Sequence, residues 1–379
     1  MRYRAGRLLP LAVGAALVLA LPGTATAAPA TAGPVPDDPG TRTEASTTVA
    51  RTDGTRTVTL FTGPVQLRRG AEWVTVDLTL RPGGDGVVRP VAAPHDLALT
   101  PTGPVVHFAD GGSAALAPVT TGPLPAPALS GNRARYAQVA PGYDLLVEAT
   151  RAGFAASIRA AGVATGPPPT LALTSTPRGA EAAPEAVAAT ESAVSRVVAA
   201  APPPGPAPVP FDTTVQSTIL RSDSSGDPDL RLGSYDGVAV ARSYLVWDLA
   251  EIAGSGAAGA PISAARLRVH QDWSSSCRPA AWQVWSVAGD GVGPATRFAA
   301  QPAAERLWAT STETRGNAAA CAPGWTEVDV TELVRSWAAS GAPSGTMLLR
   351  AADESSPLGW KRLGSAESPN VPQLEITIG

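Results

Sequence analysis

Two short segments between residues 223 and 249 have a hydrophobic pattern with a period of two residues. The apolar positions on one face are Leu230 and Leu232 in the first segment, and Leu245, Trp247 and Leu249 in the second. Successive side chains of a β-strand point to opposite faces, so this period predicts two strands. Asp-Gly and Gly-Ser turn signals flank them, which favours strands over other extended structure.

The same period recurs along most of the chain. It is found at residues 57–61, 72–80, 105–108 and 143–148 in the front half, and at 266–270, 282–287, 346–350 and 373–378 in the back half. Turn residues separate these segments. We therefore predict an all-β protein with a small β-domain over residues 48–160 and a larger β-sandwich over residues 211–379.

One stretch departs from the strand pattern. Asp329 and Glu332 are spaced like a helix-capping box, and Leu333 and Trp337 are four residues apart, so they share one helix face. We expect one short helix here that covers the sandwich and ends near Gly341.

The segment between the two predicted domains has a different composition. Residues 161–210 are rich in Ala, Pro and Gly and end in a proline run. Such a run is extended and semi-rigid, so we predict a linker.

The N-terminus predicts export. Arg2, Arg4 and Arg7 precede an apolar core, and Ala25-Thr26-Ala27 supplies a cleavage site, so residues 1–27 have the design of a signal peptide. Residues 28–47 then predict a disordered leader. No later segment is long and apolar enough to anchor the mature chain, and we expect a secreted, extracellular or cell-wall-associated protein.

Charge and motifs argue against two function classes. The net charge is −3 and no basic stripe occurs, so nucleic acid is not an expected partner. The motifs of serine hydrolases, zinc proteases and nucleotide-binding enzymes are absent, and the three histidines are isolated. We expect no enzymatic activity.

The C-terminal segments carry a family resemblance. D-L-R-L-G, R-S-Y-L-V-W-D-L, I-S-A-A-R-L-R-V-H, D-V-T-E-L-V-R-S-W and P-Q-L-E-I-T-I occur in the order found in the DNRLRE domain of secreted bacterial proteins. The resemblance covers about residues 210–379 and implies a fold similar to jelly-roll carbohydrate-binding modules. Phe298 stands where the family usually has a tryptophan.

The front half resembles a second group more loosely. W-V-T-V-D-L-T-L and Y-A-Q-V-A-P-G-Y-D-L-L-V-E-A are similar to the β-rich front portion of secreted RHS/YD-type wall-associated proteins. This resemblance implies a surface or wall context and no chemistry.

The resemblance to carbohydrate-binding modules directs attention to the tryptophans, since exposed aromatic rings in such modules stack on sugar faces. Eight of the nine lie beyond residue 240. Trp273, Trp325 and Trp360 have loop-like neighbours and are the candidates for a carbohydrate surface, with packing onto the core as the alternative. Trp247, Trp285 and Trp337 are expected in the core.

Two further sets of residues predict structural features. Cys277 and Cys321 form an even pair in an exported chain, so we predict a disulfide. Asp223, Asp227 and Asp229 alternate oxygen ligands as a calcium loop does, but Pro228 and Ser234 break the EF-hand pattern. A structural calcium ion and a solvated turn both remain open, and no other cofactor is expected.

The sequence leaves two functions open. The first is a non-catalytic protein that binds a polysaccharide or cell-wall glycan through its C-terminal sandwich. The second is a structural or adhesive surface protein that binds no glycan.

Overall fold

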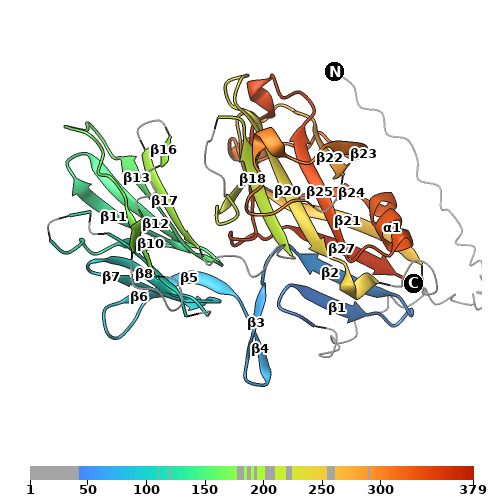
Figure 1. Cartoon of the computed structure of the whole chain (residues 1–379), viewed down its shortest axis with the longest axis horizontal. Helices are drawn as coiled ribbons and strands as arrows, with labels where there is room; N and C mark the ends of the chain where they lie inside the picture. The colour runs from blue at the N-terminus through green and yellow to red at the C-terminus, as the bar shows by residue number, and fades with distance from the viewer. Residues whose placement is uncertain are drawn as a thin grey trace, which may run out of the picture.

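The computed structural model of the chain describes residues 42–109, 111–117, 119–120, 122–176, 183–185, 189–191, 194–200, 210–218, 224–253, 261–288 and 291–379. The expected signal peptide, residues 1–27, lies outside these ranges, as do residues 28–41 of the expected leader. Strands dominate the described residues, which contain a single α-helix. This confirms the all-β prediction. Figure 1 shows two bodies of strands, one mostly from the front half and one mostly from the back half.

The back body is a sandwich of antiparallel strands. One side contains β1 (Ser46–Ala50), β2 (Arg56–Phe61), β27 (Gln373–Ile378), β21 (Ile262–Ser274), β24 (Gly324–Asp329), β26 (Lys361–Gly364) and β19 (Asp229–Ser234). The other side contains β18 (Phe211–Gln216), β20 (Val240–Asp248), β25 (Ser344–Ala351), β22 (Trp282–Val287) and β23 (Ala304–Ser311). Strand β19 pairs with both β26 and β20 and so joins the two sides.

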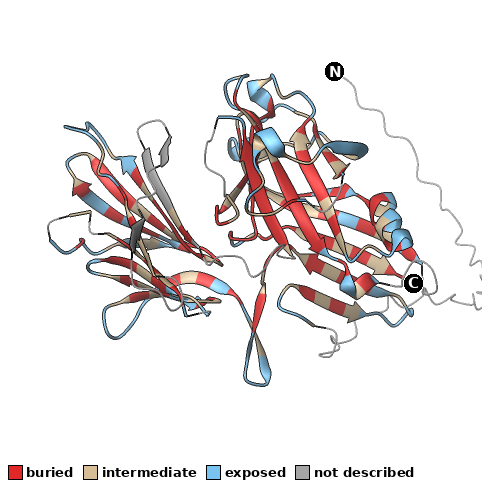
Figure 2. Ribbon diagram, viewed as in Figure 1, coloured by how far each residue is buried: buried red, intermediate tan, exposed pale blue. Residues whose placement is uncertain are grey.

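The core of the sandwich lies between these two sides. Alternate residues of β20 and β25 meet alternate residues of β21 and β27, among them Trp247, Met347, Leu267 and Leu374. Each of these four side chains is fully buried. Figure 2 shows the buried residues running along the centre of the sandwich strands. Burial therefore alternates along these strands with the period of two residues that the sequence predicted.

Helix α1 (Thr331–Ser340) covers one end of the core. Leu333 is buried and Trp337 packs against the core, as their spacing predicted. The Asp329 carboxylate accepts a hydrogen bond from the Thr331 amide at 2.8 Å. Gly341 ends the helix in the left-handed conformation, which glycine adopts without steric cost. Four short 3-10 turns complete the sandwich: η1 (Ala250–Ile252), η2 (Phe298–Ala300), η3 (Ala319–Cys321) and η4 (Pro357–Gly359).

The front body contains two further sheets and a hairpin. One sheet has β15 (Ala183–Glu185), β14 (Leu173–Thr176), β9 (Ser113–Leu116), β8 (Gly103–His107), β7 (Asp96–Thr100), β6 (Val88–Ala92) and β5 (Asp77–Pro82). The other has β10 (Ala128–Ser130), β11 (Arg133–Ala140), β12 (Tyr143–Ala149), β13 (Gly153–Ala160), β17 (Val194–Ala200) and β16 (Ala189–Glu191). Strands β3 (Gln66–Arg69) and β4 (Glu72–Thr75) form the hairpin. A second core joins the two sheets.

Strand pairing crosses the predicted domain boundaries at two places. Strand β2 belongs by sequence to the front domain, yet it pairs with β27 and aligns Leu60 with Leu374 inside the sandwich core. Strands β14 and β17 lie within the predicted linker, residues 161–210, but pair with β9 and β13 of the front body. The remaining residues of that linker are only partly within the described ranges.

A buried polar contact joins the two bodies. The Arg151 side chain, in the turn between β12 and β13, donates hydrogen bonds to the Pro64 carbonyl at 2.8 Å and to the Ser368 carbonyl. The Ala152 amide donates to the Glu367 carboxylate. Glu367 and Ser368 belong to the loop between β26 and β27, so the front body is fastened to the sandwich at this loop.

Within the described residues, no helix has the length and apolar character needed to cross a membrane.

Candidate functional site

The outer face of strand β21 and its neighbours carries the candidate residues. Leu267 and Val269 point into the core, so Arg268 and His270 point outward. The register then shifts between Gln271 and Trp273. This bulge keeps Gln271 buried and leaves Asp272 and Trp273 both partly exposed.

Strand pairing extends this outer face into a row of rings and guanidinium groups. Trp273 pairs with Arg362 of β26, and Arg362 pairs with Arg231 of β19. The Arg362 guanidinium carbon lies 5.2 Å from the centre of the Trp273 ring, which is a cation–π distance. The two side chains therefore support each other on the surface of the sheet.

Trp360 lies beside this row and is mostly buried. It follows η4, and 9% of its surface is exposed. Its ring meets the ring of Tyr235 edge to face at 5.5 Å, and Tyr235 is 52% exposed. Tyr235 was not among the residues singled out from the sequence, because its Tyr-Asp-Gly turn predicted only a loop.

Trp325 occupies a different part of the same face. It lies opposite His270 in the β21–β24 ladder, and the two rings meet edge to face at 5.4 Å. The Arg268 guanidinium carbon lies 5.4 Å from the ring centre. Both Trp273 and Trp325 thus stand on strands, although their neighbours in the sequence suggested loops.

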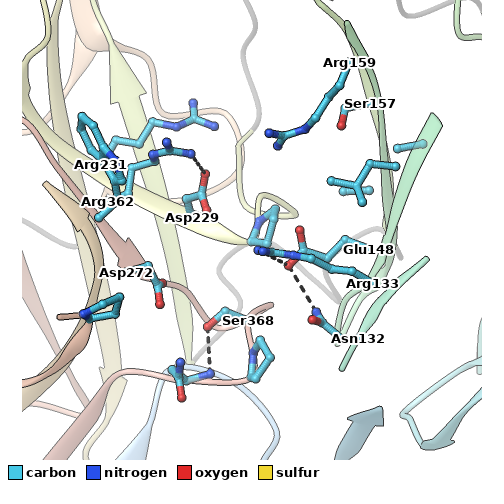
Figure 3. A pocket seen from close by; sticks show the side chains of 18 of the residues that line it. Asn132, Arg133, Glu148, Ser157, Arg159, Asp229, Arg231, Asp272, Arg362 and Ser368 are labelled. Carbon is cyan, nitrogen blue, oxygen red and sulfur yellow. Dashed lines mark hydrogen bonds and ion pairs between the residues drawn. The ribbon is translucent and has the colours of Figure 1, made fainter. Parts of the chain in front are cut away.

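A cavity of about 920 Å³ brings part of this face together with the front body. Figure 3 shows its two walls. The sandwich contributes Trp273, Trp360, Tyr235, Arg231 and Arg362. The front wall includes Asn132, in the turn before β11, and Arg133, Glu148, Ser157 and Arg159 of β11 to β13. Trp273 and Trp360 therefore share one site, whereas Trp325 is not among the lining residues.

The charges in the cavity are mostly paired. Arg133 forms an ion pair with Glu148 at 3.1 Å, and Arg362 lies 3.8 Å from Asp229. Burial opposes the charge of Arg133, yet nearby carboxylates raise its pKa above the ordinary value. These carboxylates are Glu148 beside it, and Asp229 and Asp272 from the opposite wall. The two walls therefore act on each other electrostatically.

The structure describes two of the three predicted calcium ligands, Asp227 and Asp229. Asp223 lies outside the described residues. Asp227 is buried and forms an ion pair with Arg231 at 3.3 Å, while Asp229 faces Arg362. No group of three or more acidic, histidine or cysteine side chains suited to a metal ion occurs in the part of the chain that the structure describes.

The Cys277–Cys321 disulfide is present, as predicted, with Cα atoms 5.7 Å apart. It closes a loop that packs against the end of β21. The Asn317 side chain donates to the Ser274 carbonyl at 3.0 Å, and the Arg315 amide donates to the Gln271 side chain at 3.0 Å. A Cβ atom at Gly316 would lie 2.6 Å from the Cα atom of Trp273. The loop therefore fixes the backbone that presents Trp273.

One of the three histidines lies near the site. His270 Nδ1 is 2.7 Å from the Asp272 carboxylate. The ring of this histidine contacts the Trp325 ring. The pair resembles part of a catalytic triad, which also needs a Ser or Cys nucleophile beside the histidine ring, whereas this ring contacts the Trp325 indole.

Comparison with known proteins relates the back body to a protein family. No curated protein sequence matches the chain. Residues 209–378 match the model of carbohydrate-binding module family 96, and this range covers the sandwich strands from β18 to β27. The C-terminal part of the chain is therefore supported as a carbohydrate-binding domain.

Proposed function

We propose that this protein binds a polysaccharide or cell-wall glycan on the aromatic face of its C-terminal sandwich and does not transform it. The observation that carries the proposal is the convergence of Trp273 and Trp360 on one cavity wall, together with exposed Tyr235. Aromatic faces bury the C–H surface of a sugar at small conformational cost. Arg231 and Arg362, in the same wall, have planar donor groups suited to sugar oxygens.

The arrangement of acids supports binding over hydrolysis. Glycosidases use two carboxyl groups that flank the scissile bond, one of them protonated. In this cavity Glu148 pairs with Arg133, Asp229 faces Arg362, and Asp272 pairs with His270. Carboxylates that are paired in this way are suited to orienting neighbouring side chains rather than to hydrolysis.

Export is part of the proposal. The signal-peptide design of residues 1–27 favours secretion, and a disulfide persists in oxidising compartments outside the cytosol. A wall-associated location follows from the loose resemblance of the front half to wall-associated proteins.

Binding is tested with the full mature chain and the variant Trp273→Ala. A glycan array and pull-downs with cellulose, chitin and peptidoglycan sacculi would identify a ligand, and calorimetry would measure its affinity. We expect Trp273→Ala to weaken binding about tenfold to a hundredfold, as loss of an anchoring aromatic residue does. Because the Trp273 side chain is partly exposed, the melting temperature of the variant should differ little from that of the wild type.

Trp325→Ala is the matched control, since Trp325 stands on the same sheet face outside the cavity. It should bind as the wild type does. Release of reducing sugar would show an enzyme instead. Absence of any bound glycan would favour the structural or adhesive role. Wild-type affinity in Trp273→Ala would show that the glycan binds elsewhere and would overturn the proposed site.

A further inference from the structure

We propose that the front body supplies the second wall of the glycan site, so that the polysaccharide lies between the two bodies. This inference rests on the function proposed above and assigns binding residues outside the matched domain. Its starting point is the alternation along β13. Phe154 and Ile158 are buried in the front core and do not line the cavity, whereas Ala155, Ser157 and Arg159 line it.

The shape and polarity of this wall fit an extended hydroxylated ligand. Ala155 and Ser157 are small and occupy the middle of the wall, which leaves space in front of them. Asn132 and Arg133 stand at one edge, where they are linked to Glu148. Figure 3 shows Arg159 reaching from β13 toward the opposite wall. A ligand that stacks on the sandwich wall would therefore meet hydrogen-bonding groups on its other side.

Arg159 is the most available group in this wall. It is exposed, and it has no ion-pair partner among the residues that the structure describes. Its neighbour across the ladder is Asp144, but that carboxylate accepts hydrogen bonds from Arg135 at 2.6 Å and from the Gln138 amide at 2.9 Å. The guanidinium group of Arg159 is thus left for a ligand.

The separation of the two walls is held by the buried contact at Arg151. The turn that carries Arg151 connects β12 and β13, the strands of the front wall. Its partner loop carries Glu367 and Ser368, and Ser368 lines the same cavity. A cavity whose walls are already fastened loses less freedom when a ligand binds.

The test uses the full mature chain and five soluble probes: xylan, carboxymethylcellulose, laminarin, polygalacturonate and solubilised peptidoglycan fragments. Arg159→Ala should weaken binding of whichever probes the wild type binds by about tenfold, the effect of losing one charged hydrogen-bond donor. Ser157→Trp should weaken it at least as much by filling the space. Arg81→Ala, an exposed arginine of β5 outside the cavity, should bind as the wild type does.

The outcomes separate the two proposals. Wild-type affinity in Arg159→Ala, with binding lost in Trp273→Ala, would overturn this inference and leave the proposed function standing. If the wild type binds none of these probes and no glycan on the array or in the pull-downs, both proposals fail. Weaker binding in both variants, with the melting temperature of Arg159→Ala unchanged, would establish a site with two walls, even if Ser157→Trp folds poorly.

Discussion

Lys361 is the only lysine of the chain, and it lies fully buried inside the sandwich. Its ammonium group donates a hydrogen bond to the Thr314 hydroxyl at 2.9 Å. Burial lowers its pKa from 10.5 to about 8, because the charged form loses its hydration. A buried ammonium group held by a neutral hydroxyl is a cost to stability at neutral pH.

We expect Lys361→Met to be more stable than the wild type at pH 7. The pKa shift corresponds to at most about 3 kcal/mol, which the methionine would recover in part. The folded pKa is below the unfolded one, so the wild type gains stability as the pH rises from about 8 to 10.5, and the variant lacks this gain. Urea unfolding at pH 7 and pH 10 measures both effects.

Arg362→Met is the control, because Arg362 is the next residue along β26 but stands on the outer face of the sheet. It still contains Lys361, so its stability should rise between about pH 8 and 10.5 as that of the wild type does. A Lys361→Met protein that is less stable than the wild type at pH 7 would contradict the prediction.

At the scale of single elements, the strand pattern could be predicted wherever alternation was regular. The helix was also predictable, since Asp329, Leu333 and Trp337 are spaced as a short amphipathic helix requires. The ends of β21 and β24 were not. The bulge at Gln271 interrupts the alternation and a polar residue takes an inward position, so the pattern ends before Trp273 although the strand continues.

The packing of α1 on β25 depends on a glycine that the sequence did not single out. A Cβ atom at Gly345 would lie 2.5 Å from the Trp337 ring. We expect Gly345→Ala to lower the free energy of unfolding by about 1–3 kcal/mol, the usual cost of overpacking a core. Thermal unfolding of the variant measures this loss.

Gly291→Ala provides the comparison within the same sandwich. No atom lies within 4 Å of the Cβ position at Gly291, so its melting temperature should stay close to that of the wild type. Equal melting temperatures for the two alanine variants would show that Trp337 moves away without cost.

At the scale of the whole molecule, no local pattern predicts the contacts between segments that are distant in the sequence. The apolar residues of β2 predicted a strand, but nothing local indicates that Leu60 aligns with Leu374 of the last strand. The cavity likewise depends on contacts between segments that are distant in the sequence. Trp273 and Trp360 could be selected by residue type, whereas Arg159 and Ser157 become part of a site only when the front body is fastened to the sandwich.

That fastening contact predicts a dependence on pH. Burial raises the pKa of Glu367 to about 7, against the opposing effect of the Ala152 amide and Arg151. Burial also raises the pKa of Asp212 to about 8, although Asp212 accepts hydrogen bonds from Thr62 and from the Ala366 amide. Both carboxyl groups lie where the front segment meets the loop after β26.

We expect the folded chain to lose stability as the pH rises from about 5 to 8. Each carboxyl group has a higher pKa folded than unfolded, so its contribution is fully present below the unfolded pKa and is lost as the pH rises through the folded value. For Glu367 the shift from 4.5 to about 7 corresponds to at most about 3 kcal/mol.

Glu367→Gln keeps an oxygen acceptor for the Ala152 amide but has no proton to lose. Melting temperatures from pH 5 to pH 8 should therefore fall less steeply in Glu367→Gln than in the wild type. Glu305→Gln, at an exposed position on β23, should follow the wild type. If Glu367→Gln has the same slope as the wild type, the carboxyl group of Glu367 stays ionised when buried, and the contact between the two bodies does not respond to pH through it.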